Sequence, residues 1–355
     1  MNFLLGKNLE DGYMLILETK DNIFINRKDG IMGERKALVV GINDYPSCPL
    51  YGCCNDSEAI KDLLSNHGNG EPNFSVWKKD NVSTKGELRG LIEKCFEGDA
   101  DVALFYYSGH GHIDAVGGYL VTPDFSCNDY GVSLQEILTI ANRSKCRERI
   151  IILDSCYSGF MGSINTEGQN TANIREGVTI MTASRNNQTS MEVDGHGVFT
   201  SLLIEALKGG AADITGHITI AGVYAFIDKA LGPWKQRPVF KTNVTRFTSL
   251  REVQPQVEAR ILRKIVTYFK NENYQFKLNP SFEPTNKKEV VHDVIEPYAK
   301  DENTAIFSDL QKLEGIGLVI PIGEEHMYYA AMNSKSCELT AVGKQYWRLV
   351  KEGRI

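Results

Sequence analysis

Two stretches decide the fold: VALFYYSGHGH, residues 102–112, and RIIILDSCYSG, residues 149–159. Each begins as a continuous apolar run and ends in a short polar loop that contains glycine. Continuous runs, in place of alternating ones, are typical of strands covered on both faces in a mainly parallel sheet. Two further runs of this kind are KALVVGI (36–42) and VTIMTAS (178–184). Helical segments are predicted at residues 55–66, 133–142 and 197–208. The sequence therefore predicts an α/β sandwich with helices on both faces of the sheet.

The two polar loops carry a histidine and a cysteine. In an open parallel sheet the carboxyl ends of the strands meet at one edge, so we expect His110 and Cys156 to lie close together. A thiolate is a strong nucleophile, and a neighbouring imidazole lowers the cysteine pKa and later protonates a leaving amine. A lone buried cysteine is more often a small hydrophobic residue. Two glycine-flanked loops at one sheet edge, with Asp154 beside the cysteine, favour a catalytic pair instead.

Glycine beside each reactive residue also has a chemical reason. A backbone without Cβ approaches a substrate carbonyl closely, so the amides of Gly111 and Cys156 are candidate donors to an oxyanion. His112 is an alternative to His110 as the base, because HGH presents two imidazoles in one loop.

These loops resemble the caspase-like cysteine peptidases, within them the metacaspase and paracaspase branch. The resemblance rests on SGHG, DSCYSG, KALVVGINDY and LYGCCNDSEAI, and it extends over about residues 36–245. It implies a caspase-like three-layer sandwich and an endopeptidase with a dyad of His110 and Cys156. The family has no fixed third group that orients the histidine, so none is assigned here.

The resemblance also implies a specificity pocket. The residues expected to floor this pocket in metacaspases match Cys53, Asp56, Ser108 and Asp154. Two carboxylates without a nearby arginine favour a cationic side chain, which predicts cleavage after Arg or Lys. Asp56 has an alternative role, as an acidic residue in the first turn of the helix NDSEAIKDLL.

Control of such an enzyme is less defined by the sequence. Metacaspases often need calcium, held by aspartates in loops after the catalytic strands. Position 163 is serine, and Asp114, Asp124 and Asp129 do not reproduce such a cluster. The sequence therefore requires no cofactor and indicates no metal ligands, and calcium binding is left open.

A polar segment, residues 161–177, resembles the intersubunit linker of the family, and its Arg175 suits self-processing. The next loop, within 182–207, is predicted to line the cleft, with Thr200 or Ser201 near the start of a helix. His196 in this loop is expected to be solvated and not catalytic.

Domain organisation follows from changes of pattern along the chain. Residues 1–34 hold a predicted hairpin, residues 35–250 the caspase-like domain, and residues 255–355 a smaller α+β domain. The last domain is expected to be winged-helix-like. Its predicted order is helices at 258–269 and 302–314, strands at 318–322 and 327–331, and a helix at 339–351.

The C-terminal domain is predicted to dock a protein. Its 14 Lys and Arg balance 14 Asp and Glu, and the helix DENTAIFSDLQKLE that would enter a DNA groove is acidic. Phosphate contacts would be repelled there, which argues against nucleic acid. The expected partner is a regulatory or sensor protein that activates the peptidase.

Composition places the chain among globular proteins with protein partners. A net charge of −6 gives no electrostatic reason to bind nucleic acid or an anionic membrane, and no run is long and apolar enough to cross one. The eight cysteines lack the paired spacing of a zinc site, and the N-terminus does not resemble a signal peptide. We therefore expect a cytoplasmic protein with reduced thiols.

Two other functions fit parts of the sequence. One is an inactive adaptor with a caspase fold, against which the intact cysteine and histidine argue. The other is a winged-helix transcriptional regulator, against which the acidic helix argues. By analogy, a caspase-like unit with a small appended module resembles prokaryotic stress or antiviral effectors.

The self-processing hypothesis predicts one cleavage position. Under conditions that activate the protein, mass mapping should find fragments that end at Arg175, because a mobile segment can enter a pocket that accepts arginine. An activated sample that stays uncut after Arg175 would remove the hypothesis.

Overall fold

The computed structural model describes most of the chain. The described residues are 15–19, 22–26, 33–127, 129–155, 164–166, 169–171, 174–183, 192–193, 195–232, 238–245, 247–288 and 294–355. Two compact units divide it: Met1–Asn66 with Pro72–Leu202 and Asp228–Arg246, and His67–Glu71 with Leu203–Ile227 and Phe247–Ile355.

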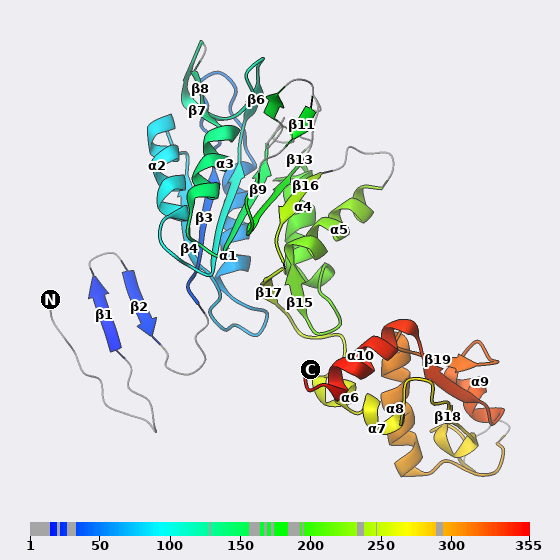
Figure 1. Ribbon diagram of the computed structural model, residues 1–355. Coiled ribbons are helices and arrows are strands. Elements are labelled where there is room, and N and C mark those ends of the chain that lie inside the picture. Colours follow the sequence, from blue (N-terminus) through cyan, green and yellow to red (C-terminus); the bar gives the residue numbers. More distant parts are fainter. Residues whose placement is uncertain are drawn as a thin grey trace. The chain divides into compact units, whose positions relative to one another are not determined.

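A six-stranded sheet forms the centre of the first unit (Figure 1). Its strands, in the order in which they lie, are β16 (Val239–Asn243), β12 (Val178–Thr182), β9 (Glu148–Asp154), β5 (Val102–Ser108), β3 (Arg35–Gly41) and β4 (Ser75–Asp80). Each neighbouring pair is parallel except β12 and β16. The predicted mainly parallel sheet is therefore confirmed, with its four buried runs at the predicted positions.

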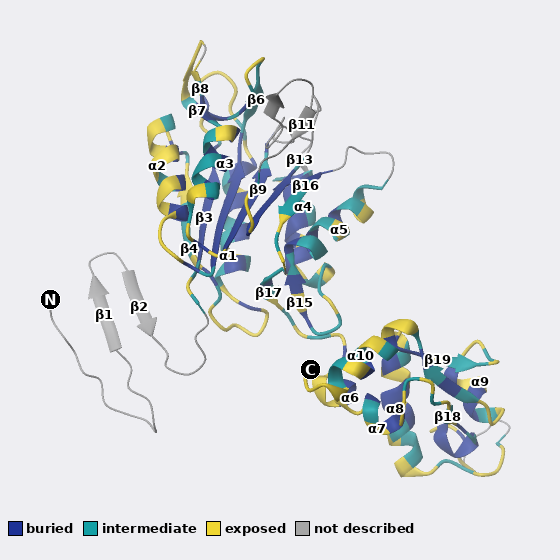
Figure 2. Cartoon of the chain, viewed as in Figure 1, coloured by how far each residue is buried: buried dark blue, intermediate teal, exposed yellow. Residues whose placement is uncertain are grey.

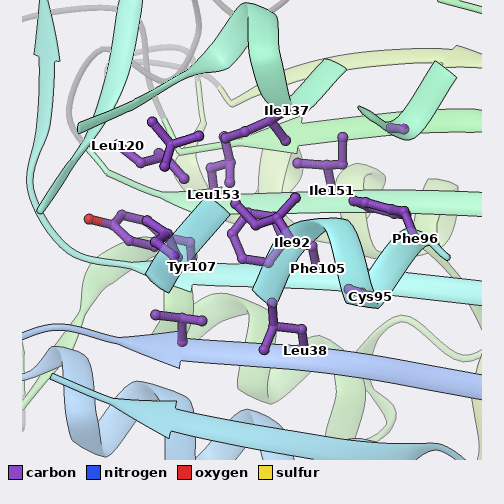
Figure 3. Close-up of a cluster of buried hydrophobic side chains, with 14 of the residues drawn as sticks. Leu38, Ile92, Cys95, Phe96, Phe105, Tyr107, Leu120, Ile137, Ile151 and Leu153 are labelled. Atoms are coloured by element: carbon purple, nitrogen blue, oxygen red, sulfur yellow. The ribbon is translucent and has the colours of Figure 1, made fainter. Parts of the chain in front are cut away.

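Helices cover both faces of this sheet. Helix α1 (Cys53–Ser65) packs on one face, and α2 (Lys85–Phe96) and α3 (Leu134–Arg143) pack on the other (Figure 1). Strand residues alternate between the faces, so Leu38, Phe105 and Ile151 point into the cluster beneath α2 and α3 (Figure 3). Figure 2 shows how completely the central strands are buried.

Several elements of the first unit were not identified from sequence. Strand β4 lies at the sheet edge, and its sequence, SVWKKD, is too polar to be identified as a buried strand. Helix α2 is amphipathic and begins at the cap Thr84, whose hydroxyl accepts from Glu87 N. Beyond β5 the chain forms a small antiparallel sheet of β6 (Gly111–Ile113), β7 (Gly118–Ser126) and β8 (Asp129–Ser133).

Three hairpins and three further helices lie in the described residues before β16. The predicted N-terminal strands are the antiparallel pair β1 (Leu15–Thr19) and β2 (Asn22–Asn26). The others are β10 (Ile164–Thr166), β11 (Gln169–Thr171), β13 (Glu192–Val193), β14 (His196–Gly197), α4 (Val198–Glu205), the π-helix Ala206–Gly210 and α5 (Ile220–Leu231).

The C-terminal part of the second unit has its own hydrophobic core. Its elements are α6 (Ala259–Arg263), α7 (Ile265–Tyr268), β18 (Phe276–Lys277), the 3-10 helix Pro280–Phe282, α8 (Asp301–Gly315), β19 (Val319–Ile322), α9 (Met327–Met332), β20 (Ser336–Leu339) and α10 (Ala341–Lys351). Earlier in the same unit, β15 (His217–Thr219) and β17 (Ser249–Glu252) pair with each other. Phe269, Phe307 and Trp347 belong to this core. Within the described ranges, every helix falls short of the length and apolar character that a bilayer span needs.

One predicted strand is wrong. Residues 327–331 were expected to pair as part of a wing, but they lie in α9. Met327, Ala330 and Ala331 are buried while Tyr328 and Tyr329 are exposed, a spacing of three and four that belongs to a helix. The two tyrosines favour strand by propensity, and packing overrides that preference. The sheet is three-stranded, in the order β18, β20, β19, so the winged-helix resemblance stays a prediction.

The central core gives a stability prediction. Ile151→Ala should lower the unfolding free energy by about 2–5 kcal/mol, because it leaves a cavity in a close-packed sheet. Urea unfolding measures this change. Val116→Ala is the control, because Val116 is 87% exposed and its loss should change stability by less than about 0.5 kcal/mol. Equal midpoints for the two variants would contradict the assignment of Ile151 to the core.

Candidate active site

The two loops predicted to carry the chemistry leave the sheet at the same level. Ser108, the last residue of β5, is the register partner of Asp154, the last residue of β9. The amide of Gly109 continues this pairing and donates to the Asp154 carbonyl at 3.3 Å. His110 follows Ser108 by two positions, as Cys156 follows Asp154 in the sequence. Cys156 itself lies outside the described residues.

Backbone contacts hold His110 in place. Its amide donates to the Tyr45 hydroxyl at 3.0 Å, and its carbonyl accepts from Val121 N at 2.9 Å and from the Tyr107 hydroxyl at 3.1 Å. The Tyr45 and Tyr107 hydroxyls are 3.0 Å apart, and burial raises the pKa of both phenols. A Cβ at Gly109 would come within 2.6 Å of both hydroxyl oxygens, so only glycine fits there.

The imidazole of His110 has a defined orientation. Its Nε2 lies 2.7 Å from the carbonyl oxygen of Cys48, and its ring meets that of Tyr45 edge to face at 4.5 Å. A carbonyl can only accept a hydrogen bond, so this contact requires a proton on Nε2 and leaves Nδ1 as the ring nitrogen that can accept one. The Cys48 carbonyl is thus the orienting group that sequence reasoning left unassigned. A main-chain oxygen leaves no signal in the sequence.

His112, the alternative base, is engaged elsewhere. Its ring stacks on Tyr130 with centroids 3.9 Å apart, on the small sheet of β6, β7 and β8.

The direction of the Gly111 N–H follows from the pairing of β6 with β7. The hydrogen bond from Val121 N to His110 O makes those two residues a hydrogen-bonded pair of this antiparallel ladder. Gly111 is the next residue along, so its N–H points away from β7, as an oxyanion donor requires.

The four predicted pocket residues do come together in the structure. Asp56 lies on α1 and is 1% exposed, and its Oδ2 accepts from the Ser108 hydroxyl at 2.9 Å. Burial raises the pKa of the Cys53 thiol to about 12, although a hydrogen bond with Ser108 opposes the shift. Asp56 and Asp154 both raise it further by their charges. Cys53, Ser108 and the two carboxylates therefore form one cluster at the carboxyl edge of the sheet.

Asp56 does lie in the first turn of α1, as its alternative role expects, but the cap residue of this helix, Gly52, makes no side-chain cap hydrogen bond. The side-chain oxygen of Asn43 accepts from the amides of Cys53 and Cys54 at the start of α1. The Asp56 carboxylate instead faces Ser108 and His196. Burial raises the Asp56 pKa, and these hydrogen bonds partly offset that effect.

Asp154 is bound by the start of helix α4. Its Oδ2 accepts from the Thr200 hydroxyl at 2.6 Å and from the Thr200 amide at 3.3 Å. The Thr200 hydroxyl also lies 2.6 Å from the hydroxyl of Tyr106. Burial raises the pKa of Asp154 to about 6, despite these donors, and the charge of Asp56 adds to the rise.

His196 contradicts its sequence-based interpretation. It was expected to be solvated, but its Nδ1 lies 2.7 Å from Asp56 Oδ1 and the side chain is only 28% exposed. Gly197 follows it directly beside both carboxylates, since a Cβ there would come within 2.7 Å of Asp154 Oδ2 and 3.7 Å of Asp56 Oδ2.

The aspartates considered as calcium ligands have other partners. Asp114 accepts from the amides of Val116 and Gly117, Asp124 accepts from Lys85 N, and Asp129 pairs with Lys85 Nζ at 2.9 Å. In the part of the chain that the structure describes, no three His, Cys, Asp or Glu residues gather as a metal site.

Arg175 lies just before β12 and its side chain is exposed. Its amide donates to the Asn142 side chain at 2.9 Å, and its guanidinium donates to the Asn142 carbonyl at 3.4 Å.

A family model and a curated relative match the chain. The family model of the caspase domain, Peptidase_C14, matches residues 34–283. Metacaspase-9 of Arabidopsis thaliana is 35% identical over 96 residues, which is 24% of this chain and 29% of that relative. The chain thus covers less than a third of the length of this relative. The family match ends beyond the boundary expected near residue 250, while one of several divisions between the two compact units falls between Arg246 and Phe247. The domain boundary therefore stays a prediction.

Two solved structures whose titles name a caspase-1 are also similar. Caspase-1 from Spodoptera frugiperda is 15% identical, with a TM-score of 0.46 over 64% of this chain and 96% of that one. The structure titled pro-sf-caspase-1 is 15% identical, with a TM-score of 0.44 over 61% of this chain and 94% of that one.

Asp154 gives a prediction about stability and pH. Its pKa is raised from 3.8 to about 6 in the folded protein, so the folded state binds the proton more tightly than the unfolded chain does. The stability that Asp154 contributes by binding this proton is fully present below about pH 4 and is lost as the pH rises through about 6. Asn does not titrate, so the unfolding free energy of Asp154→Asn minus that of wild type should be about 1–3 kcal/mol larger at about pH 7.5 than at about pH 4.5.

Urea unfolding at the two pH values provides the measurement. Asp129→Asn is a matched control, because Asp129 is an exposed carboxylate paired with Lys85. If wild type and Asp154→Asn respond equally to pH, the account of Asp154 as a destabilised buried carboxylate is wrong.

Proposed function

Because the chain belongs to the caspase-domain family Peptidase_C14, we propose that it is a cysteine endopeptidase with a dyad of Cys156 and His110. The observation that carries the proposal is the orientation of His110, whose Nε2 donates to the Cys48 carbonyl. Nδ1 is therefore the nitrogen that can act as the base. His110 follows β5, whose last residue pairs with the last residue of β9, the strand that leads to Cys156.

The reaction follows from this arrangement. His110 Nδ1 takes the proton of the Cys156 thiol, and the thiolate attacks the carbonyl carbon of the substrate. The amides of Gly111 and Cys156 donate to the oxyanion that forms, which typically contributes about 3–4 kcal/mol of barrier lowering for one donor. The imidazolium then gives its proton to the leaving amine as the C–N bond breaks. Water, deprotonated by His110, hydrolyses the thioester and regenerates the thiol.

The pocket supports cleavage after Arg or Lys. Asp56 and Asp154 lie around Gly197. Two acidic groups in a partly desolvated site favour a cation, and arginine can bind a carboxylate with two parallel hydrogen bonds. A bound cation would also stabilise ionised Asp154, whose pKa is raised in its absence.

Control of the peptidase is proposed to lie outside the dyad. A regulatory or sensor protein is expected to dock on the C-terminal domain, whose acidic helix α8 disfavours nucleic acid. Self-processing at Arg175 and a role as a cytoplasmic stress or antiviral effector belong to the same proposal. Arg175 is exposed, but the hydrogen bond from its backbone N–H to the Asn142 side chain would have to break before the segment could enter a cleft.

The dyad is tested by substitution and substrate choice. Cys156→Ala and His110→Ala should each lower kcat/KM for a peptide ending in arginine by at least about a thousandfold, because the nucleophile or its base is lost. Hydrolysis of a fluorogenic peptide measures this, and a citrulline analogue, which lacks the positive charge, should be a poor substrate.

Two controls make the result specific. Cys127→Ala removes an exposed cysteine and should leave turnover unchanged, and circular dichroism should show that the inactive variants are folded. Turnover that survives Cys156→Ala, or equal hydrolysis of the arginine and citrulline peptides, would overturn the dyad or the specificity respectively.

A further inference from the structure

We infer that His196 is a positioning residue for the basic-residue pocket, acting on the substrate through Asp56. This inference rests on the proposed function, because it concerns the pocket of that peptidase. It assigns a role to a residue that sequence reasoning placed in solvent.

Two side chains of helix α1 bind the segment 195–197. Asn55 Nδ2 donates to the Gly195 carbonyl at 3.3 Å, and the next residue of the helix, Asp56, binds His196 Nδ1 at 2.7 Å. The turn at Gly195 has φ of 78°, a conformation that favours glycine. The loop is therefore attached to the helix at two consecutive positions.

This attachment places Gly197 beside both carboxylates. Its missing side chain leaves room for Asp154 Oδ2, which a Cβ would approach within 2.7 Å. Three residues further on, Thr200 binds that same oxygen of Asp154. One short segment thus contacts Asp56 through His196 and Asp154 through Thr200, so the spacing of the two acids depends on it.

His196 also favours the ionised form of Asp56. Asp56 is buried, which raises its pKa, and the hydrogen bonds from His196 and Ser108 act in the opposite direction. The titratable groups around Asp56 are His196 on β14, Asp154 on β9, Tyr106 on β5 and Cys53 on its own helix. Within this described set, His196 is the group that can carry a positive charge.

The two acids therefore have different roles. Asp56 accepts hydrogen bonds from Ser108, His196 and the Gly197 amide. Asp154 is bound at one oxygen by the hydroxyl and amide of Thr200, and no cationic side chain of the described residues pairs with it. We assign direct pairing with the substrate cation to Asp154. Asp56, whose ionised form is favoured by the hydrogen bond from His196, adds negative potential and binds Ser108.

The test compares two variants of the full-length protein. His196→Leu removes the donor while filling its volume, and His196→Asn keeps a donor toward Asp56. His196→Leu should raise KM for an arginine peptide about tenfold and change kcat by less than about twofold, since the reacting groups are untouched. The acidic limb of the kcat/KM profile should move to higher pH, because Asp56 loses a donor to its charged form. His196→Asn should restore most of the KM.

Two measurements separate this role from a general loss of structure. The rate of Cys156 alkylation by iodoacetamide, which has no basic side chain, should stay the same in His196→Leu. Asp56→Asn should raise KM as His196→Leu does, and the double variant should be no worse than Asp56→Asn alone, because His196 acts through Asp56. His217→Ala, a half-exposed histidine in the second unit, is the matched control.

The outcomes are distinct for the inference and for the function beneath it. A wild type that hydrolyses the arginine peptide through Cys156, with unchanged KM and acidic limb in His196→Leu, would overturn the role of His196 alone. The same follows if Asp56→Asn folds and leaves KM unchanged. A wild type that does not cleave after basic residues would overturn both the inference and the proposed specificity.

Discussion

The register of β5 against β9 is the constraint on which the rest of the site depends. Ser108 pairs with Asp154, and the proposed base and nucleophile, His110 and Cys156, each follow one of these two residues by two positions. The strands beneath them are almost completely buried, and a shift of one residue would turn every core side chain of a strand to the opposite face. The core therefore fixes the level at which both loops leave the sheet. This is how a hydrophobic cluster far from the reacting atoms can position them.

The site is held at a cost to stability. Two carboxylates lie close together where desolvation raises the pKa of each, and the tyrosine hydroxyls that anchor His110 are also buried. Hydrogen bonds from Ser108, Thr200 and His196 compensate for part of that cost. Buried polar networks of this kind are maintained where function requires them. A pocket for a basic side chain gives such a reason, since a bound cation would complete the pairing that the free protein lacks.

How much could be predicted from the sequence differs between elements. The buried strands could be predicted, because continuous apolar runs are local signals, whereas the four residues of the pocket cluster were predicted from the resemblance to metacaspases. Strand β4 and helix α9 could not, since a polar edge strand and a short tyrosine-containing helix take their structure from tertiary packing. The Cys48 carbonyl and His196 were missed for a related reason. Their roles come from contacts across 62 and 140 positions of the chain, which no local pattern contains.

The most direct test of the central claim is the pH dependence of thiol alkylation, followed for each cysteine by peptide mass spectrometry. If His110 activates Cys156, that thiol should react faster than the exposed Cys127, with an apparent pKa well below the usual value of about 8.5. In His110→Ala the apparent pKa of Cys156 should return toward that value while Cys127 is unaffected. Alkylation of Cys156 with an ordinary pKa, unchanged by His110→Ala, would contradict the account.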